Sequence, residues 1–362
     1  ELPHARAVAQ RFGTEHHELV LRGCSLELLR DLNWHHDEPA GDSAAVPTYC
    51  LSHFARRHIT VVLTGEGGDE TFAGYPHHRH AVRLGQLSRL PGFSLAARGV
   101  SRLEGLLGAR GSARFWKAAW IAGLAPAERH RAWVAAYTDT ELAKLLGPEL
   151  RAAVRNGSLT APFRELHRRV QERTPLDQLL YVDAKLSLAD QLLMKVDKTT
   201  MAASLEARCP LLDQDLLEYA AALPDSLKWS AKGGGKRVLR HALRGLLGDA
   251  ILDRPKQGFD VPLETWLLRD LEATVEAGLL DDAAPIGRYL DQETVRVTWA
   301  RFRRRRDMRS CRQIWRLLNL AVWHEIHWPS GRLGDFGEPG GADASATFRD
   351  LFVEKTAVPK TA

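Results

Sequence analysis

The first 80 residues alternate between helical and strand-like hydrophobic patterns. Ala5, Val8 and Phe12 fall on one face at helical spacing, which predicts a helix over Leu2 to Phe12 that ends at Gly13. The elements expected after it are a strand over His17 to Leu21, helices over Leu26 to Asn33 and Val46 to Arg57, and a short buried strand over Ile59 to Leu63. Helices that alternate with short buried strands predict an α/β fold with a parallel sheet, which binds ligands at the carboxyl ends of its strands.

From Ala81 to Trp328 the pattern is helical, and no further strand is expected. The expected helices cover Phe115 to Ala122, Pro126 to Tyr137, Leu176 to Met201, Leu211 to Leu223, Lys236 to Leu247, Leu263 to Ala277 and Cys311 to Trp328. The remainder is rich in Gly, Ala, Pro and polar residues, which is typical of disorder. We therefore expect an α/β core over residues 1–80, a mostly helical region over 81–328 and a disordered tail over 329–362.

Directly after the last predicted strand, the segment Thr64 to Glu70 contains three glycines and three carboxylates. Glycines let the backbone approach a ligand closely and present N–H groups to an anion. Carboxylates beside a phosphate are suited to Mg²⁺, which takes oxygen ligands and bridges phosphates. The turn therefore indicates the edge of a nucleotide–Mg²⁺ site. The alternative is an ordinary strand-to-helix turn in which Asp69 is the helix N-cap.

The charge pattern gives no support for a nucleic-acid partner. The formal net charge is +5 and the pI is about 9.1, but the excess comes from scattered arginines. The basic run Arg301 to Arg306 is expected to be a solvated helix face, because no aromatic residues are interleaved with it as stacking platforms.

Cysteine spacing and hydropathy lead us to expect a cytoplasmic protein. The cysteines lack the paired spacing of a zinc ribbon or disulfide framework, so they are expected to be buried free thiols. No apolar run reaches the ~18–20 residues of a membrane span, and no signal peptide is visible. We expect no membrane partner.

Together with the turn, five other segments form an ordered set of motifs: Asp37 to Tyr49, Phe72 to Tyr75, Asp190 to Lys198, Met201 to Asp213 and Arg254 to Phe259. In this order they closely resemble the synthetase domain of glutamine-hydrolysing asparagine synthases, from about Glu1 to Trp328. The resemblance implies that residues 1–80 are part of a nucleotide-binding core of the adenine nucleotide alpha hydrolase-like, PP-loop type.

The resemblance also implies roles for the residues of the turn. Glu66 matches the acidic residue tied to forming the acyl-adenylate, and Asp69 matches the Mg²⁺ ligand. Thr64 and Gly65 match residues that touch the adenosine part of ATP, and we include Gly67 among the nucleotide-binding residues. The chemistry agrees, because adenylating a carboxylate brings two anions together and needs cations and oriented N–H donors.

Two lysines complete the expected site. Lys256 lies between Pro255 and Gly258 in a loop that can hold a compact positive charge on a phosphate or oxyanion, and we assign it a catalytic role. Its alternative is a solvated surface lysine. The family places the polar residues of helix Leu176 to Met201 beside the phosphates and the acceptor, so we assign Lys195 to the nucleotide; the alternative is i,i+4 charge pairing. Lys198 stands where the family commonly has arginine, which puts bidentate recognition there in doubt.

Other polar residues are expected to be structural. We predict Glu70 on the surface and a buried Arg208–Asp213 pair that joins the helical region to the sheet. Adjacent histidines should diverge rather than share a metal. We expect ordinary histidines at His16 and His17, His35 and His36, and His77 and His78.

Two parts of the family are missing from this sequence. The chain begins with Glu1 inside a predicted helix, so we expect that something upstream has been lost. The glutaminase domain, which opens with a nucleophilic cysteine, has no counterpart and is expected as a partner in cis or in trans. The phosphate-gripping Ser-Gly-Gly-x-Asp-Ser loop, expected shortly before Glu1, is also absent. We therefore expect little or no synthetase activity from this chain alone.

The function predicted from the sequence is ATP- and Mg²⁺-dependent adenylation of aspartate, followed by amidation with glutamine-derived ammonia to asparagine, AMP and pyrophosphate. One alternative is a related amide- or lactam-forming ligase with another acceptor. Another is a non-catalytic scaffold subunit, against which the retained segment Thr64 to Asp69 and Lys256 argue. We also consider a homodimer.

Overall fold

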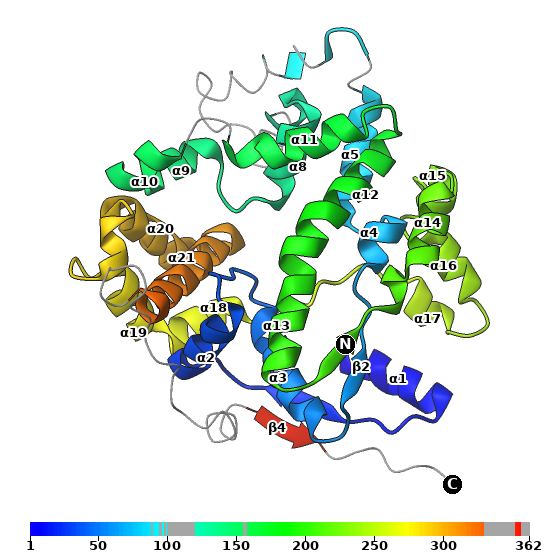
Figure 1. Cartoon of the computed structure of the whole chain (residues 1–362), viewed down its shortest axis with the longest axis horizontal. Coiled ribbons are helices and arrows are strands. Elements are labelled where there is room, and N and C mark those ends of the chain that lie inside the picture. The colour runs from blue at the N-terminus through cyan, green and yellow to red at the C-terminus, as the bar shows by residue number, and fades with distance from the viewer. Residues whose placement is uncertain are drawn as a thin grey trace.

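The computed structural model describes residues 1–87, 90–93, 96–97, 99, 120–154, 158–328 and 352–355, and most of these are helical (Figure 1). The amino-terminal elements are α1 (Leu2–Phe12), β1 (Glu18–Leu21), α2 (Leu26–His36), α3 (Ala45–Arg56), β2 (Val61–Leu63), α4 (Gly68–Phe72) and α5 (Pro76–Leu87). The middle elements are α8 (Pro126–Val134), α9 (Asp139–Leu145), α10 (Pro148–Ala153), η1 (Ser158–Thr160), α11 (Ala161–Arg169), α12 (Pro175–Asp183), η2 (Ala184–Leu193) and α13 (Met194–Ala202).

The carboxyl-terminal elements are mostly short. They are β3 (Glu206–Arg208), η3 (Pro210–Leu212), α14 (Gln214–Ala222), α15 (Asp225–Lys228), α16 (Arg237–Ala242), α17 (Asp249–Leu252), α18 (Leu263–Thr265), η4 (Trp266–Asp270), α19 (Glu272–Val275), η5 (Glu276–Leu280), η6 (Pro285–Arg288), α20 (Gln292–Arg305), α21 (Met308–His327) and β4 (Phe352–Lys355). The predicted helices within the described residues are confirmed in position, although α16 is shorter than expected, α14 begins only at Gln214, and the helix expected over Leu263 to Ala277 is divided into α18, η4, α19 and η5. Residues 115–119 and 155–157, where a helix and a break were predicted, lie outside the described residues.

The predicted parallel sheet is present only as a pair of short strands. β2 pairs in parallel with β3, so that Val61 lies opposite Glu206 and Leu63 opposite Arg208. β1 does not join this pair; it is antiparallel to β4, which makes the sheet prediction wrong for β1. β3 was not expected because three residues are too few for a period-2 pattern. The prediction of a disordered tail is wrong for β4, and the rest of that tail lies outside the described residues.

β2 is not the buried strand that its apolar sequence predicts. Leu63 is 70% exposed and Val61 is 47% exposed. An apolar strand is buried only when a layer packs against each face of its sheet. In the part of the chain that the structure describes, no layer covers the face that carries these two side chains.

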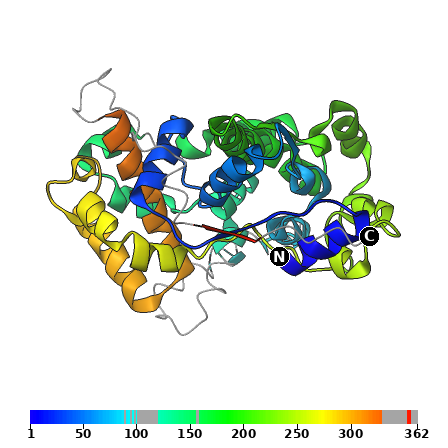
Figure 2. The same cartoon turned by 90° about the horizontal axis from the view of Figure 1, so that it is seen from below.

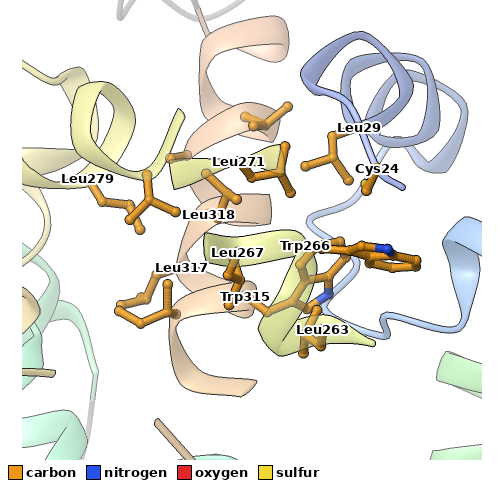
Figure 3. Close-up of a cluster of buried hydrophobic side chains, with 14 of the residues drawn as sticks. Cys24, Leu29, Leu263, Trp266, Leu267, Leu271, Leu279, Trp315, Leu317 and Leu318 are labelled. Carbon is orange, nitrogen blue, oxygen red and sulfur yellow. The ribbon is translucent and has the colours of Figure 1, made fainter. Parts of the chain in front are cut away.

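The main hydrophobic core lies away from the sheet. It joins α2 and α3 to the short helices from α18 to η6 and to α20 and α21. Figure 3 shows Cys24 and Leu29 next to Trp266 and Trp315, all almost completely buried. Burying a side chain of the size of Leu29 contributes about 1.5–3 kcal/mol to the stability of the fold. Residues from the predicted core over residues 1–80 therefore share one interior with the last helices of the chain.

The predicted helix Leu176 to Met201 is confirmed as a run from Pro175 to Ala202 through α12, η2 and α13. Thr174 caps it by accepting from the Asp177 backbone N–H, and η2 has π-helical hydrogen bonding, which often marks functional positions. Figures 1 and 2 both place the core helices α19 to α21 at one end of the molecule and α14 to α17 at the other. The long helix lies between these two groups of helices and packs on α3, α2 and α5.

Three smaller predictions can be compared with the structure. The four cysteines are free, and three of them are buried, as expected. The arginines from Arg303 to Arg306 are exposed at the end of α20. Among the described residues, no helix combines the length and the apolar character needed to cross a bilayer.

His36 makes the stability of the fold depend on pH. Its ring is fully buried, and neither ring nitrogen has a hydrogen-bond partner among the described residues. Burial lowers its pKa to about 4, aided by the charge of Lys198. The unfolded chain, with a pKa of about 6.5, binds this proton more readily, so stability is lost as pH falls through the interval between these values. We expect the free energy of unfolding to fall by about 2 kcal/mol from this group between pH 7.5 and pH 5.

Urea unfolding at these two pH values measures the effect. His36→Gln should show a smaller loss than the unchanged chain, whereas His80→Gln, at an exposed position of α5, should match it. An equal loss in His36→Gln would show that other groups cause the pH dependence.

Candidate functional site

The turn after β2 continues the parallel strand pair by one residue. The Thr64 backbone N–H donates to the Arg208 carbonyl over 2.8 Å, and the Thr64 hydroxyl lies 3.2 Å from Cys209 Sγ. Gly65, which follows, is exposed, and a Cβ built on it would meet no heavy atom within 4 Å. The turn therefore offers open space directly at the carboxyl end of β2.

Gly67 ends the turn and is the N-cap of α4, so the alternative in which Asp69 caps this helix is wrong. Its φ of 86° favours glycine, and a Cβ would lie 2.1 Å from Leu212 Cδ2. The requirement for glycine at this position follows from its backbone conformation and from packing. Its proposed contact with nucleotide remains a prediction.

Asp69 lies between two lysines. Its Oδ2 accepts from Lys256 Nζ over 2.8 Å, and its Oδ1 lies 3.0 Å from Lys236 Nζ. Burial opposes ionisation of this carboxyl, but the two ammonium groups outweigh it and lower the pKa of Asp69. Asp69 is therefore an ionised carboxylate that pairs with two lysines at the carboxyl end of β2.

Lys236 is a site residue that the sequence analysis missed. It has a left-handed backbone with φ of 53°, and its N–H donates to the Phe72 carbonyl over 2.7 Å. Gly235 packs so closely that a Cβ there would lie 1.8 Å from the Ala73 carbonyl oxygen. The available signal was the glycine-rich loop Lys232 to Lys236, which has a lysine at each end.

The Glu66 side chain has no hydrogen-bond or ion-pair partner in the part of the site that the structure describes. Its carboxylate is half-buried. Burial raises its pKa; Lys195 and Lys256 oppose this rise, whereas the charges of Asp42 and Asp69 add to it. Glu66 is thus a carboxylate surrounded by charges of both signs and available for contact with a substrate.

Lys195 is 6% exposed and donates to Asp42 Oδ2 over 3.0 Å. The other oxygen of Asp42 accepts from the Ala44 backbone N–H, just before α3. Asp42 was also missed as a site residue, although it lies within the motif Asp37 to Tyr49. Lys198 reaches Asp37 from the same helix, so both lysines connect this motif to α13.

Two structural predictions about neighbouring residues are wrong. Glu70 is 2% exposed and accepts a hydrogen bond from the Tyr75 hydroxyl, because the short helix α4 turns it towards the interior. Arg208 pairs with Glu206, its neighbour on the same face of β3. Asp213 caps α14 by accepting from two backbone N–H groups, so it has no pair with Arg208.

The prediction that adjacent histidines diverge is wrong for His77 and His78. Both rings contact one carboxylate, that of Asp183. Neighbouring positions on a helix point in different directions, but a carboxylate that lies between two imidazole rings is within reach of both.

The structure thus brings together Glu66, Asp69, Lys195 and Lys256, with Thr64 and Gly65 at the edge of the same turn. An ionised carboxylate at Asp69 fits Mg²⁺, which uses one or two protein carboxylates beside substrate oxygens, and the lysines fit the phosphates that Mg²⁺ accompanies.

The family model described as asparagine synthase matches residues 1–325. The chain belongs to the asparagine synthase family. It is 30% identical over 350 residues to a putative glutamine-hydrolysing asparagine synthetase of Mycobacterium tuberculosis (strain ATCC 25618 / H37Rv), covering 94% of this chain and 50% of that protein. Asparagine synthetase 1 (glutamine-hydrolysing) of Bacillus subtilis (strain 168) is 29% identical over 298 residues, covering 81% of this chain and 45% of that protein.

A more distant relative, amidase chry2 of Gibberella zeae, is 25% identical over 281 residues, covering 72% of this chain and 41% of that protein. The chain spans about half the length of the curated relatives that match most of it. Asparagine synthases are ATP-dependent amide ligases, and the match confirms the family inferred from the motifs.

Proposed function

We propose that this asparagine synthase chain forms an adenylating site. A carboxylate acceptor, with aspartate as the first candidate, is activated by ATP and Mg²⁺ and then amidated by ammonia. Glutamine hydrolysis by a glutaminase in cis or in trans supplies the ammonia. The products are asparagine, AMP and pyrophosphate.

The observation that carries the proposal is the position of Glu66. Its carboxylate is without a partner among the described residues, while the cations nearest to it, Lys195 and Lys256, are paired with the carboxylates Asp42 and Asp69. Such paired lysines are held in place before a substrate arrives, and preorganised charge stabilises a transition state without reorganisation. The arrangement suits a reaction between two anions.

In the first step, an acceptor carboxylate oxygen attacks the α-phosphorus of ATP, and the bond to the bridging oxygen breaks to release pyrophosphate. In the second, ammonia attacks the acyl carbon, and AMP leaves with the former carboxylate oxygen. Lys256 would stabilise negative charge on the phosphates. Asp69 would hold Mg²⁺, which supplies charge neutralisation when it is bound. Thr64 and Gly65 would contact the adenosine, and the N–H of Gly67 would face the phosphates.

Product analysis of the protein purified from its native source tests the proposal. The protein is supplied with ATP, Mg²⁺, ammonium and one carboxylate at a time, beginning with aspartate. AMP and amide that form in equal amounts, and only when the acceptor is present, are the expected result. ADP as the nucleotide product would contradict the proposal.

Two fungal relatives are described as amidases, which favours a second class of acceptor. If aspartate gives no AMP but another carboxylate does, the chemistry stands and the acceptor differs. If no carboxylate gives AMP, a non-catalytic role is the better account.

Gly74→Ala should disable the site through steric displacement of Asp69. A Cβ at this position would lie 1.8 Å from Asp69 Oδ1 and 2.5 Å from Lys236 Cε, so both groups must move. Misplacing a reacting group by about 1 Å can cost on the order of 10²-fold in rate. We expect a loss of that size in acceptor-dependent AMP formation.

The matched control is Gly278→Ala, in which the new Cβ would meet nothing within 4 Å. This variant should keep the parent rate. A Gly74→Ala variant with full activity would show that the position of Asp69 does not matter for turnover.

A further inference from the structure

A second polar cluster lies behind the loop that carries Tyr75, centred on Asp183 of α12. His77 Nε2 lies 3.0 Å and His78 Nε2 lies 2.8 Å from Asp183 Oδ2, both from the start of α5. His130 Nε2, from α8, lies 2.9 Å from Asp183 Oδ1. Two helices, α5 and α8, therefore direct three imidazole nitrogens at both oxygens of one carboxylate on α12.

The carboxylate is deeply buried, and it lacks a permanent cation. Asp183 is 1% exposed. A buried anion is costly unless an opposite charge or hydrogen bonds compensate it. Among the described residues, no lysine or arginine forms an ion pair with it, and its ion-pair partners are the three histidines. His78 and His130 are fully buried, whereas His77 is 20% exposed and gives access from solvent.

A fourth histidine contacts the ring nitrogen of His130 that faces away from Asp183. His167 Nε2, from α11, lies 3.3 Å from His130 Nδ1. The His130 tautomer with its proton on Nδ1 donates to His167 Nε2 and leaves the Nε2 lone pair for a metal ion. Histidine ligands of metals are commonly oriented by such a second hydrogen bond.

We propose that His77, His130 and Asp183 form a binding site for a divalent transition-metal ion of the Zn²⁺ type. One ligand atom from each of the three lies within 4.8 Å of the others. Imidazole nitrogen and carboxylate oxygen are common Zn²⁺ donors, and bonds of 2.0–2.1 Å in a tetrahedron place ligand atoms about 3.3 Å apart. Each nitrogen lies beside a different oxygen of Asp183, His77 Nε2 at 3.0 Å from Oδ2 and His130 Nε2 at 2.9 Å from Oδ1, and each separation needs to widen by only a few tenths of an ångström.

In this site His78 has a supporting role. Its Nε2–H donates to Asp183 Oδ2 and so orients the carboxylate, as the hydrogen-bonded neighbours of metal ligands commonly do. The bound ion neutralises the buried carboxylate and joins α5, α8 and α12.

The site also contacts the proposed adenylating centre. The His77 ring stacks on Tyr75, with centroids 5.2 Å apart and an interplanar angle of 15°. Tyr75 donates to Glu70, and Lys256 Nζ lies 5.8 Å from the Tyr75 ring centroid. An ion at His77 therefore stabilises the loop that carries Tyr75, whose ring Lys256 contacts. Its contribution to the reaction is structural, not chemical.

Titration of the tag-free chain with Co²⁺, in the absence of nucleotide, tests the inference by the visible d–d absorption of a tetrahedral centre. We expect one equivalent of Co²⁺ to bind, Zn²⁺ to displace it, and Zn²⁺ to raise the midpoint of thermal unfolding. His77→Gln and His130→Gln should each weaken Co²⁺ binding by at least about tenfold. His80→Gln, an exposed histidine on the same helix, should bind as the unchanged chain does.

His77→Gln is the more informative variant because its side chain is partly exposed and its loss should leave the fold intact, which circular dichroism checks. If no stoichiometric tetrahedral spectrum appears, the inference is wrong and the cluster is a metal-free hydrogen-bond network. An equal spectrum in folded His77→Gln would place the ion elsewhere and overturn it as well.

Discussion

Replacing Glu66 by glutamine is expected to lower acceptor-dependent AMP formation by roughly 10²–10⁴-fold, the range typical for loss of a positioned acid–base or charged group. Glutamine keeps the size of the side chain and removes its charge. Because Glu66 lies beside Lys195 and Lys256, its negative charge contributes to the electrostatic potential at the place where the acceptor and ATP would bind. The loss should appear in kcat more than in the KM for ATP.

The same substitution should leave stability unchanged or slightly improved. The pKa of Glu66 is raised by burial, so above its ordinary pKa the ionised side chain weakens the fold, and a neutral amide removes that cost. Thermal unfolding of the variant provides the measurement, with Glu172→Gln, an exposed position, as the matched control for both assays. A Glu66→Gln protein that turns over at the parent rate would remove Glu66 from the reaction.

Replacing Lys256 by methionine is expected to reduce kcat/KM for ATP by roughly 10²–10³-fold, the range seen when one preorganised charge-stabilising group is lost. Methionine keeps most of the length of the side chain and removes its cation. Asp69 would retain Lys236, so the carboxylate should stay ionised and the fold should remain stable. Lys232→Met, at an exposed position of the nearby loop, is the matched control and should keep the parent rate.

A double-mutant cycle with Asp69→Asn separates two accounts of Lys256. The two side chains are in direct contact at 2.8 Å, so their effects on turnover should not be additive. Additive losses would mean that Lys256 acts on substrate without help from Asp69. Full activity in Lys256→Met would restore the interpretation of a solvated surface lysine.

The parts of the site that the sequence predicted are those specified by short local motifs. The turn from Thr64 to Asp69 follows a strand, and its glycines show where the backbone bends. Lys256 could be assigned because its loop resembles a family motif, and the structure places it on Asp69. In both cases the signal is contained in fewer than ten residues.

The parts that were missed depend on contacts between distant segments. Asp42 and Lys195 are 153 positions apart, and nothing in either motif shows that they pair. The burial of Glu70 and the exposure of Leu63 depend on which layers pack against α4 and β2. The convergence of His77 and His78 required the position of Asp183, more than 100 residues away.

The division of the chain near residue 80 stays a prediction. The packing adds one observation that bears on it, since Leu29 and Trp315 lie in the same core. Unfolding of the two regions in a single transition would favour one cooperative unit.

The most direct test of the adenylating site is the fate of the acceptor's carboxylate oxygen. The protein from its native source is given ATP, Mg²⁺, ammonium and aspartate labelled with ¹⁸O in its side-chain carboxylate, and the AMP is analysed by mass spectrometry. The account predicts one ¹⁸O atom in each AMP, because the oxygen that attacks the α-phosphorus leaves with it. AMP formed without label, or ATP cleaved to ADP instead, would contradict the account.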